Sequence, residues 1–450
     1  MGRELLNKEP GFRASIEQCD RLLSEHVNWS LLDELNKSES HSCLSETEIA
    51  QPSLFALQVA LANLWRDWGI EPDAVVGHSM GEVAAAHISG ALSLSDAIQV
   101  IYHRSRLLQQ VAGQGKMVAV DLSVVELARD RLCVAAINSP TSTVLSGSEA
   151  MVVEVVQTLE RKGVLCQFLR GNSAFHSPQV EPLQSELVQA LKGLSPKAAT
   201  IPLFSTVTGQ MIDGRHVDAT YWSQNLRQTV LFSAAIDELI ASGHNKFVEI
   251  SPHPVLSGAI AQCLHHRQQE GIALPSLRRQ GNERQVLLES LGTLYSLGYS
   301  VNWSSLYPAK GQNVQLPTYP WQRQRYWLFP ATGDRLRELP REINGVSSPT
   351  PVSHTQLDVK PSDRHDLESY FRQQLVKVLK FPASELDLQQ PFRTLGIDSL
   401  MAIELKYRIE NDLGVTIKMA EFLQCSNIAE LATKIEQLRI TNEELEEGEI

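Results

Sequence analysis

The stretch of sequence on which the fold depends most reads Asp73-Ala74-Val75-Val76-Gly77-His78-Ser79-Met80-Gly81-Glu82. Its apolar beginning predicts a short strand, its glycines permit a tight turn around Ser79, and the small residues after Met80 predict a helix. A strand, a turn and a helix in this order indicate α and β layers built on a parallel sheet. Upstream, leucines at helical spacing predict a helix over residues 51–68, and these are Leu54, Leu57, Leu61 and Leu64.

The same turn is a candidate chemical site, because its Gly-x-Ser-x-Gly form lifts a serine hydroxyl clear of the sheet. Ser79 is therefore a candidate nucleophile. The amide N–H of Met80 would face a developing oxyanion, with help from the helix N-terminus. The alternative is a surface serine between glycines that has no chemical role.

Two of the thirteen histidines are candidates for the base that a serine nucleophile needs. His176 ends the segment Asn172-Ser173-Ala174-Phe175-His176, and His253 lies in Ser251-Pro252-His253-Pro254. The two prolines fix the backbone around His253, so carbonyl groups there could accept a hydrogen bond from a catalytic imidazole. Either histidine could instead be structural, and spacing alone does not choose between them.

Arg104 lies on a predicted helix downstream of Ser79. An arginine beside a serine nucleophile would indicate a substrate with a free carboxylate, because a planar guanidinium pairs with a carboxylate through two hydrogen bonds. The alternative is an arginine on a solvated helix face, which is our interpretation of Arg106.

The composition limits the classes of function. A chain of 450 residues is long enough for about two to four domains, and 43% hydrophobic with 20% charged residues is an ordinary globular composition. The net charge of −12 disfavours nucleic acid as a partner, because an acidic surface repels phosphates. No apolar run reaches the roughly 18 residues of a membrane span and no leader opens the chain, so we expect no membrane contact. Six cysteines without a Cys-x-x-Cys pair favour a cytoplasmic location, without disulfides or a metal site.

Residues 116–170 differ in pattern from their surroundings. Their β-α-β-β-α-β order predicts a small ferredoxin-like insert. The expected strands cover residues 117–122, 134–138, 143–146 and 164–168, and the expected helices cover residues 124–132 and 149–162.

Four segments of different character follow the α/β part. Residues 306–330 are rich in aromatic rings and arginines. Such side chains either stack on the bases of single-stranded nucleic acid or pack as a strap on a neighbouring domain. The acidic net charge of the chain favours the strap. Residues 331–362 have the Ser, Pro and Thr content of a flexible linker. Residues 363–440 are acidic with helical apolar spacing, which predicts a helical bundle, and residues 441–450 form an acidic tail. The apolar positions of the bundle are Leu375, Val378, Leu379, Leu400, Ile403, Tyr407, Ile428, Leu431 and Ile435.

Four motifs in this order resemble the acyltransferase domain of modular polyketide synthases, a relative of malonyl-CoA:acyl-carrier-protein transacylase. They are Gly77-His78-Ser79-Met80-Gly81-Glu82, Arg104, Ala174-Phe175-His176 and Ser251-Pro252-His253-Pro254. The resemblance covers residues 1–330. It implies an acyltransferase domain over residues 1–305, with an α/β-hydrolase-like core and the ferredoxin-like insert, followed by the strap over residues 306–330.

The resemblance also implies roles for single residues. Ser79 would be the acylated nucleophile and His176 its general base. A carbonyl of the turn around Pro252 and His253 would orient His176 in place of a triad carboxylate. Arg104 would bind the free carboxylate of the extender unit, and Gln51 matches a family glutamine near the site.

Ser173-Ala174-Phe175-His176 corresponds to the selectivity motif of the family. Malonyl-selective domains tend to read His-Ala-Phe-His there, and methylmalonyl-selective domains tend to read Tyr-Ala-Ser-His. Phe175 therefore favours malonyl, while Ser173 departs from both patterns. A phenylalanine would crowd an α-methyl group, and one methyl group is worth about 1–3 kcal/mol of discrimination.

The resemblance further implies a first strand and a Gly-Gln-Gly loop whose glutamine amide is a second oxyanion donor. The chain opens at Met1-Gly2-Arg3, which resembles the sequence just after that loop. We therefore expect one oxyanion donor to be missing and the enzyme to be impaired, since one donor is worth about 2.7–4 kcal/mol.

Leu395-Gly396-Ile397-Asp398-Ser399-Leu400 resembles the phosphopantetheine attachment motif of acyl carrier proteins. A phosphodiester on Ser399 would lie at a helix N-terminus, where free amides favour an anion. The alternative is an ordinary Asp-Ser helix cap. The resemblance implies a four-helix carrier domain over residues 363–440 that bears 4′-phosphopantetheine on Ser399.

Together these resemblances imply an acyltransferase–carrier didomain of a type I polyketide synthase. It would move an extender unit, malonyl, from malonyl-CoA or a related acyl-CoA through an acyl ester of Ser79 to the arm on Ser399. A ketosynthase, other synthase domains and a phosphopantetheinyl transferase would be its partners. Two other hypotheses stay open. A serine hydrolase such as a thioesterase would have an acidic triad member, and a truncated acyltransferase could be a scaffold beside a working carrier.

Overall fold

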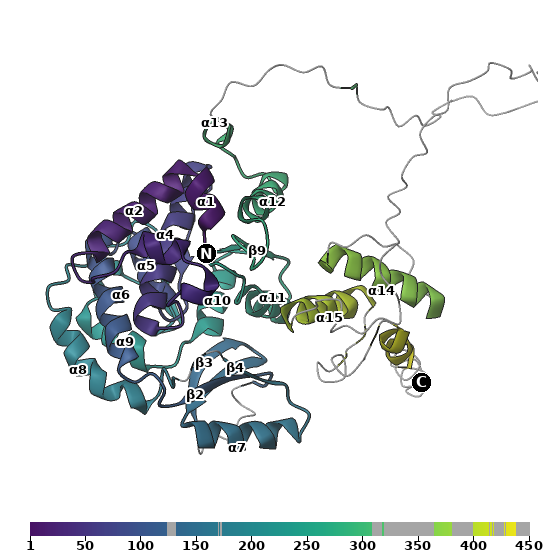
Figure 1. The fold of residues 1–450 in the computed structure, drawn as a ribbon. Coiled ribbons are helices and arrows are strands. Elements are labelled where there is room, and N and C mark those ends of the chain that lie inside the picture. The colour runs from purple at the N-terminus through teal and green to yellow at the C-terminus, as the bar shows by residue number, and fades with distance from the viewer. Residues whose placement is uncertain are drawn as a thin grey trace, which may run out of the picture.

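The computed structural model describes residues 1–123, 132–169, 171, 173–307, 317–318, 364–379, 399–413, 415, 417, 427 and 429–437. Most of these residues belong to an α/β unit in which helices surround small sheets (Figure 1). Helices dominate the first part of this unit. They are α1 (Arg3–Lys8), α2 (Pro10–Leu23), α3 (Leu31–Asn36), α4 (Thr47–Asp67), α5 (Gly81–Ile88) and α6 (Leu94–Gln109).

Helix α4 is central to this part of the fold. Helices α2, α5 and α6 all pack against it, and most of its apolar residues belong to the main hydrophobic core. A helix that is apolar on most of its circumference is stable only when neighbours cover it on several sides, as they do here. The helix predicted over residues 51–68 is therefore confirmed, and it begins earlier, at Thr47.

The strand, turn and helix predicted around Ser79 are present. Strand β1 (Val75–Val76) ends directly before the turn, and α5 begins at Gly81. β1 pairs in parallel with β6 (Leu203–Ser205), and β6 pairs antiparallel with β7 (Gln210–Ile212). A second parallel pair consists of β8 (Lys246–Glu249) and β9 (Ile272–Pro275). The turn thus stands at the carboxyl end of a parallel strand, which is where α/β folds place their sites.

Between residues 116 and 168, the described strands form an antiparallel sheet in the order β3-β4-β2-β5. This is the strand order of a ferredoxin-like sheet. The elements are β2 (Lys116–Val120), β3 (Cys133–Ser139), β4 (Ser142–Gly147), α7 (Glu149–Glu160) and β5 (Cys166–Phe168). The four predicted strands and the helix predicted over residues 149–162 are confirmed, with ends shifted by at most two residues. The other predicted helix, over residues 124–132, lies outside the described residues except for Leu132.

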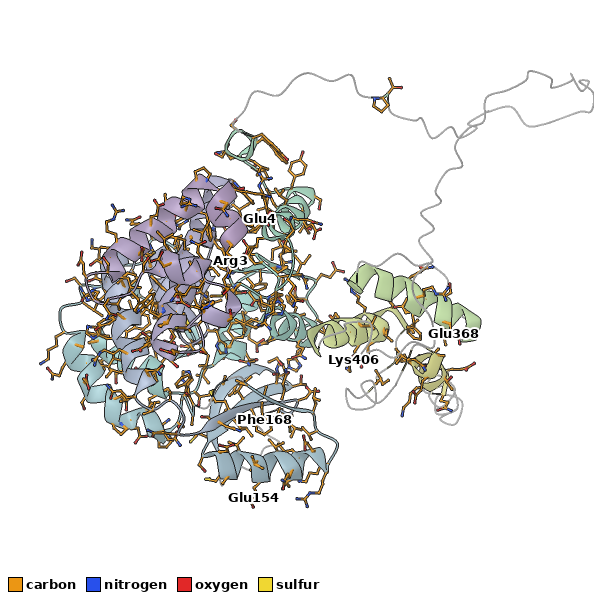
Figure 2. All side chains as sticks on the ribbon, viewed as in Figure 1. Arg3, Glu4, Glu154, Phe168, Glu368 and Lys406 are labelled. Carbon is orange, nitrogen blue, oxygen red and sulfur yellow. The ribbon has the colours of Figure 1, made fainter. Side chains whose placement is uncertain are left out.

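The insert has a small core of its own between its sheet and α7. Figure 2 shows Glu154 on α7 and Phe168 on β5, the strand at one edge of the sheet. β3 forms the opposite edge, and its Ala135 and Ala136 belong to a core cluster of the large unit. Val144 of β4 belongs to the same cluster, so the insert packs on the large unit through β3 and part of β4. Its own core consists of Val118, Val120, Leu145, Val152, Val156 and Leu159.

The rest of the α/β unit is again mainly helical. Several helices begin at a side chain that accepts a backbone N–H: Ser93 for α6, Asp218 for α9 and Asn282 for α12. The helices are α8 (Glu181–Ala190), α9 (Ala219–Arg227), α10 (Phe232–Ala241), α11 (Ser257–His266), α12 (Glu283–Ser296) and α13 (Trp303–Leu306).

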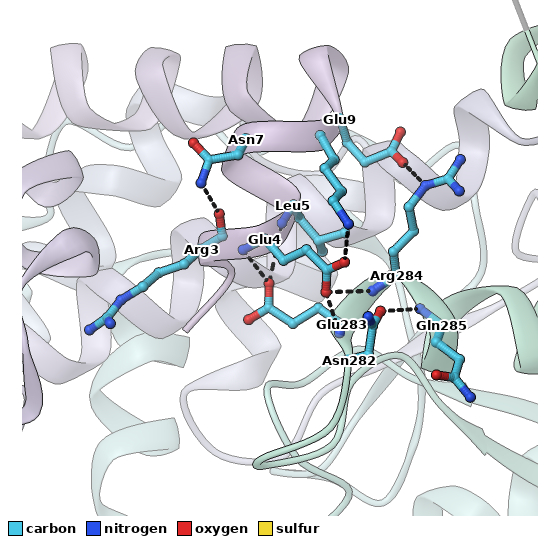
Figure 3. A network of polar contacts seen from close by, with 10 residues as sticks. Arg3, Glu4, Leu5, Asn7, Glu9, Asn282, Glu283, Arg284 and Gln285 are labelled. Atoms are coloured by element: carbon cyan, nitrogen blue, oxygen red, sulfur yellow. Dashed lines mark hydrogen bonds and ion pairs between the residues drawn. The ribbon is translucent and has the colours of Figure 1, made fainter.

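The N-terminal ends of α1 and α12 cap each other (Figure 3). The Glu283 carboxylate accepts the backbone N–H of Gly2 at 2.8 Å. It also accepts the backbone N–H groups of Glu4 and Leu5, at 2.9 and 3.2 Å. In return, the Glu4 carboxylate accepts the backbone N–H groups of Glu283 and Arg284 at 2.8 and 3.4 Å. A carboxylate accepts the free N–H groups at a helix N-terminus, and its negative charge interacts favourably with the positive end of the helix dipole. Each helix therefore stabilises the start of the other.

Most of the described residues between 363 and 440 are helical, as predicted. They form α14 (Arg364–Leu379), α15 (Ser399–Leu413) and a helix over residues 429–437. The predicted positions Leu431 and Ile435 are buried, but Tyr407 is 39% exposed, so its place in the predicted apolar face is wrong. Leu405, Ile409 and Leu413 take that place. Their four-residue spacing forms a continuous aliphatic stripe, whereas a tyrosine tolerates water at its hydroxyl end.

Several predicted features lie outside the described residues. These are the linker over residues 331–362, the acidic tail, most of the strap and the segment from Leu395 to Asp398. Within the residues that the structure does describe, every helix is too short or too polar to cross a lipid bilayer.

Candidate active site

Ser79 occupies a strained turn between β1 and α5. Its φ is 52°, in the left-handed region that residues other than glycine seldom adopt. Gly77 makes the turn possible, since a Cβ there would lie 2.2 Å from the backbone nitrogen of Glu82. Met80 is the N-cap residue of α5, so its amide lies at the open end of the helix.

The fold brings Ser79 and His176 together. Ser79 Oγ lies 2.8 Å from His176 Nε2, and His176 Nδ1 lies 2.8 Å from the backbone carbonyl oxygen of Gln228. A carbonyl oxygen can only accept, so Nδ1 carries the proton and donates it to Gln228. Nε2 therefore keeps its lone pair and accepts the Ser79 O–H. This is the tautomer that a general base needs.

The electrostatic surroundings keep His176 neutral. Its side chain is 4% exposed. Burial, and next the positive charge of Arg104, lower the pKa of His176 to about 3. The imidazole is thus free of an added proton at pH 7 and is able to take one up.

The turn around Pro252 and His253 does not orient His176, so that prediction is wrong. The orienting carbonyl belongs to Gln228, which directly follows α9. The turn instead serves the start of α11. Its organising group is the buried Glu249 carboxylate, which accepts the Ser251 hydroxyl and the backbone N–H groups of Val255, Leu256 and Ser257. The prolines do restrict this backbone, but the restriction supports the N-terminus of α11. His253 has a different partner, because its Nδ1 accepts the backbone N–H of Arg279 at 3.2 Å.

Arg104 lies beside Ser79, as expected, and Gln51 contacts Arg104. Arg104 is 2% exposed. Its Nη2 donates to Ser79 Oγ at 2.9 Å, and its Nη1 donates to Gln51 Oε1 at 2.6 Å. Burial lowers the pKa of Arg104 to about 10, so the group stays charged at neutral pH. Among the described residues, no carboxylate forms a salt bridge with Arg104, and its Nε has no hydrogen-bond partner.

A buried carboxyl group lies beneath the serine turn. Glu82 is 2% exposed and accepts hydrogen bonds from the N–H and hydroxyl of Thr206 and from the Tyr221 hydroxyl. Burial raises the pKa of Glu82 to about 7, against the opposing effect of these donors. Asn225 donates its side-chain N–H to the backbone carbonyl of Ser79 at 3.2 Å. The turn is therefore supported from below by polar contacts with α9.

The remaining predicted residues lie close to His176 in the chain. Phe175 is half-buried against the main core, and Ser173 is half-buried as well. The sequence interpretation missed Gln228 and Asn225. No sequence signal could have found Gln228, because it acts through a carbonyl group that every residue possesses.

Two observations bear on the class of enzyme. A serine hydrolase was expected to have an acidic group at the second nitrogen of its histidine, but the Gln228 carbonyl occupies that position at 2.8 Å. In the described ranges, no group of three or more His, Cys, Asp or Glu side chains is arranged to hold a metal ion.

Two protein families match parts of this chain. Residues 1–299 match the acyl transferase domain family, and this range contains Ser79, Arg104 and His176. Residues 369–435 match the phosphopantetheine attachment site family, and this range contains Ser399. The cofactor of the second domain is a covalently attached 4′-phosphopantetheine.

Relatives with similar sequences are polyketide synthases. Polyketide synthase GfsE of Streptomyces halstedii is 42% identical over 346 residues, which are 74% of this chain and 9% of that protein. Erythronolide synthase EryA2 of Saccharopolyspora erythraea is 39% identical over 339 residues, 74% of this chain and 10% of that protein. Spectinabilin polyketide synthase system protein NorC of Streptomyces orinoci is 36% identical over 438 residues, 93% of this chain and 19% of that protein. The chain thus spans less than a fifth of the length of each of these relatives.

Solved structures of acyltransferases resemble the α/β unit. The acyltransferase domain from module 8 of the salinomycin polyketide synthase has a TM-score of 0.66 and 38% identity, covering 68% of this chain and 74% of that one. A loading acyltransferase from the avermectin modular polyketide synthase has a TM-score of 0.62 and 37% identity, covering 66% of this chain and 95% of that one. The chain therefore belongs to the acyl transferase family, as an acyltransferase segment of a modular polyketide synthase followed by a phosphopantetheine carrier domain.

Proposed function

We propose that this chain loads a carboxylated extender unit, malonyl, from an acyl-CoA onto its own carrier domain through an acyl ester of Ser79. The observation that carries the substrate class is Arg104, a buried guanidinium that donates to Ser79 Oγ at 2.9 Å. A buried cation without a carboxylate partner is costly, and the free carboxylate of a malonyl group would supply that partner. Arg104 would hold it beside the nucleophile.

In the first half-reaction, Ser79 Oγ attacks the thioester carbonyl carbon while its proton passes to His176 Nε2, 2.8 Å away. The new Oγ–C bond forms, and the oxyanion is stabilised by the amide N–H of Met80 at the start of α5. When the C–S bond breaks, His176 returns the proton to the leaving thiolate. The Gln228 carbonyl keeps the imidazole in the tautomer that both steps require.

Substrate binding would also activate the pair. In the structure, Arg104 donates a hydrogen bond to the Oγ lone pair of Ser79 and disfavours a second positive charge on His176. A bound carboxylate would draw the guanidinium away from Oγ and neutralise its charge. Both effects make proton transfer from Ser79 to His176 easier. Acyl groups without a carboxylate would lack this activation.

Ser399 is the proposed attachment residue of the cofactor. It is the first residue of α15, a helix of 15 residues, so a phosphodiester there would lie at the helix N-terminus and meet its free amides. The bound group supplies a thiol on a flexible arm, which accepts the acyl unit as a thioester. In this return half-reaction, His176 holds the released proton at Nε2 and delivers it to Ser79 Oγ as the ester breaks.

We assign the acyltransferase domain, with an α/β-hydrolase-like core and an insert over about residues 116–170, to residues 1–305. The strap then covers residues 306–330, the linker 331–362, the four-helix carrier 363–440 and the acidic tail 441–450. Phe175, which directly precedes His176, favours malonyl over methylmalonyl, because an α-methyl group would meet its ring. A phosphopantetheinyl transferase, a ketosynthase and other synthase domains are the proposed partners, in the cytoplasm.

Intact mass spectrometry tests this function. The chain is first treated with a phosphopantetheinyl transferase and CoA, and then incubated with malonyl-CoA or with acetyl-CoA. A malonyl adduct on the arm that requires both Ser79 and Ser399, judged with Ser79→Ala and Ser399→Ala, supports the proposal. An adduct that survives Ser79→Ala, or equal loading by acetyl-CoA, contradicts it.

A further inference from the structure

We propose that one strand of the insert, β3, holds both Ser79 and His176 in place, through Asn138 on the serine side and through residues 228–230 on the histidine side. Asn138 and Thr229 would then be positioning residues for the reaction. The inference rests on the proposed function in one respect only, that Ser79 and His176 form the reactive pair.

On the serine side, the neighbour of the nucleophile is tied to β3. His78 Nε2 lies 2.8 Å from Oδ1 of Asn138, and the His78 ring lies against Phe232 with 5.4 Å between ring centroids. Burial lowers the pKa of His78, so the ring is neutral and Nε2–H donates to the amide oxygen. A ring held on two sides restricts the backbone at residue 78. That restriction acts directly on the left-handed φ of Ser79.

On the histidine side, the carbonyl that holds His176 is tied to the same strand. His176 itself has a left-handed φ of 56°, so its ring depends on the Gln228 carbonyl for its orientation. The two residues after Gln228 are hydrogen-bonded to β3. The bonds run from Thr229 Oγ1 to Val134 O at 2.7 Å, from Val230 N to Ala135 O at 2.9 Å and from Ile137 N to Val230 O at 2.9 Å.

The pairing of β3 within its own sheet is adapted to these contacts. The register between β3 and β4 shifts twice, between Val134 and Ala136 and between Ile137 and Ser139. The positions skipped are Ala135, whose carbonyl accepts Val230 N–H, and Asn138, whose side chain accepts His78. Irregularities of this kind re-aim groups out of a sheet and occur next to active sites. Here the Ala135 carbonyl binds the segment that follows Gln228, and the Asn138 side chain binds His78, the residue before Ser79.

Because both sets of contacts lie within five residues of one strand, residues 134–138, displacing the insert carries Ser79 and His176 together and preserves their separation. Losing either contact would let one partner move without the other. A misplacement of about 1 Å at a reacting group is enough to lower a rate by about 100-fold. The insert therefore acts on catalysis through geometry, without touching the substrate.

A serine-directed fluorophosphonate tests the inference without any acyl-CoA. Its rate constant of Ser79 labelling and its binding constant are measured by intact mass at several probe concentrations. Asn138→Ala and Thr229→Val remove one contact each, and Asn138→Asp keeps the acceptor for His78. Thr143→Val is the matched control. Thr143 lies on β4 of the same sheet, and the substitution removes its partly buried hydrogen bond to the backbone carbonyl of Leu122, at 2.8 Å.

We expect Asn138→Ala and Thr229→Val to lower the labelling rate constant by about tenfold or more, with the probe's binding constant within about twofold. Asn138→Asp should recover most of the rate, and Thr143→Val should keep it even if its melting temperature falls. Labelling of both contact variants at the wild-type rate would overturn the proposal, as would an equal loss in Thr143→Val. If the wild type reacts with the probe but takes up no malonyl group, the proposed function fails while this test still decides the inference.

Discussion

The substitution Glu82→Gln should make the protein more stable than the wild type at neutral pH, but much less so in mild acid. Burial raises the pKa of Glu82 from 4.5 to about 7. Between these pH values the folded carboxyl holds its proton and the unfolded one does not, so the folded state binds more protons. The stability contributed by the protonated carboxyl is complete below about pH 4.5 and is lost as the pH rises to about 7.

The size of this effect follows from the two pKa values of Glu82. At about 1.4 kcal/mol per pH unit, the difference changes the free energy of unfolding by about 3 kcal/mol. Glutamine has the same shape and no charge. Its Oε1 can accept from Thr206, and its Nε2 can donate to the Tyr221 hydroxyl, which can in turn donate to Ser205 Oγ at 2.7 Å. The advantage of the variant over the wild type should therefore grow by about 3 kcal/mol between mild acid and neutral pH.

Urea unfolding followed by tryptophan fluorescence measures this difference from about pH 5 to about pH 8. Three tryptophans, Trp65, Trp68 and Trp222, are buried in the main core and report on its loss. The lowered pKa of His176 is common to both proteins and cancels in the difference. Tyr221→Phe removes a donor to the carboxylate, so its own loss of stability should extend to higher pH than that of the wild type. A difference between Glu82→Gln and wild type that is constant across this range would refute the reasoning.

Three further predictions concern charge and shape, two of them at the site and one at the start of α11. Arg104→Met should lower kcat/KM for malonyl-CoA by at least about 100-fold, since two charged hydrogen bonds to the malonyl carboxylate are lost. It should lower kcat/KM for acetyl-CoA far less. Equal losses in the rates of Ser79 acylation by the two substrates would contradict the carboxylate role. Glu249→Gln should lower the free energy of unfolding by about 1–3 kcal/mol, because the carboxylate accepts several backbone N–H groups at the start of α11; an unchanged urea midpoint would show that the cap contributes nothing. Phe175→Ser should raise the ratio of methylmalonyl to malonyl uptake by about tenfold or more in a competition measured by mass; an unchanged ratio would remove Phe175 from the selectivity determinants.

Much of the local structure could be predicted from the sequence. The apolar run before Gly77 and the small residues after Met80 predict the strand and helix that enclose Ser79, and both are present. Short apolar runs in residues 116–170 predict the four strands of the insert to within two residues. These features depend on neighbours in the chain, because strand and helix periods are properties of short segments.

The arrangement of the site depended on tertiary structure. Spacing did not choose between His176 and His253, and the fold chose by bringing His176 Nε2 to 2.8 Å from Ser79 Oγ. The orienting carbonyl proved to be that of Gln228 rather than one in the 251–254 turn. A sequence cannot indicate which backbone carbonyl accepts a given hydrogen bond, since every residue has one. The acceptor is decided by which donor lies opposite to it in the folded chain. From the sequence alone the candidates were Ser79, Arg104 and two histidines. The tertiary structure brings Ser79, Arg104 and His176 together and places the Gln228 carbonyl opposite His176, because contacts between residues far apart in the chain form only on folding.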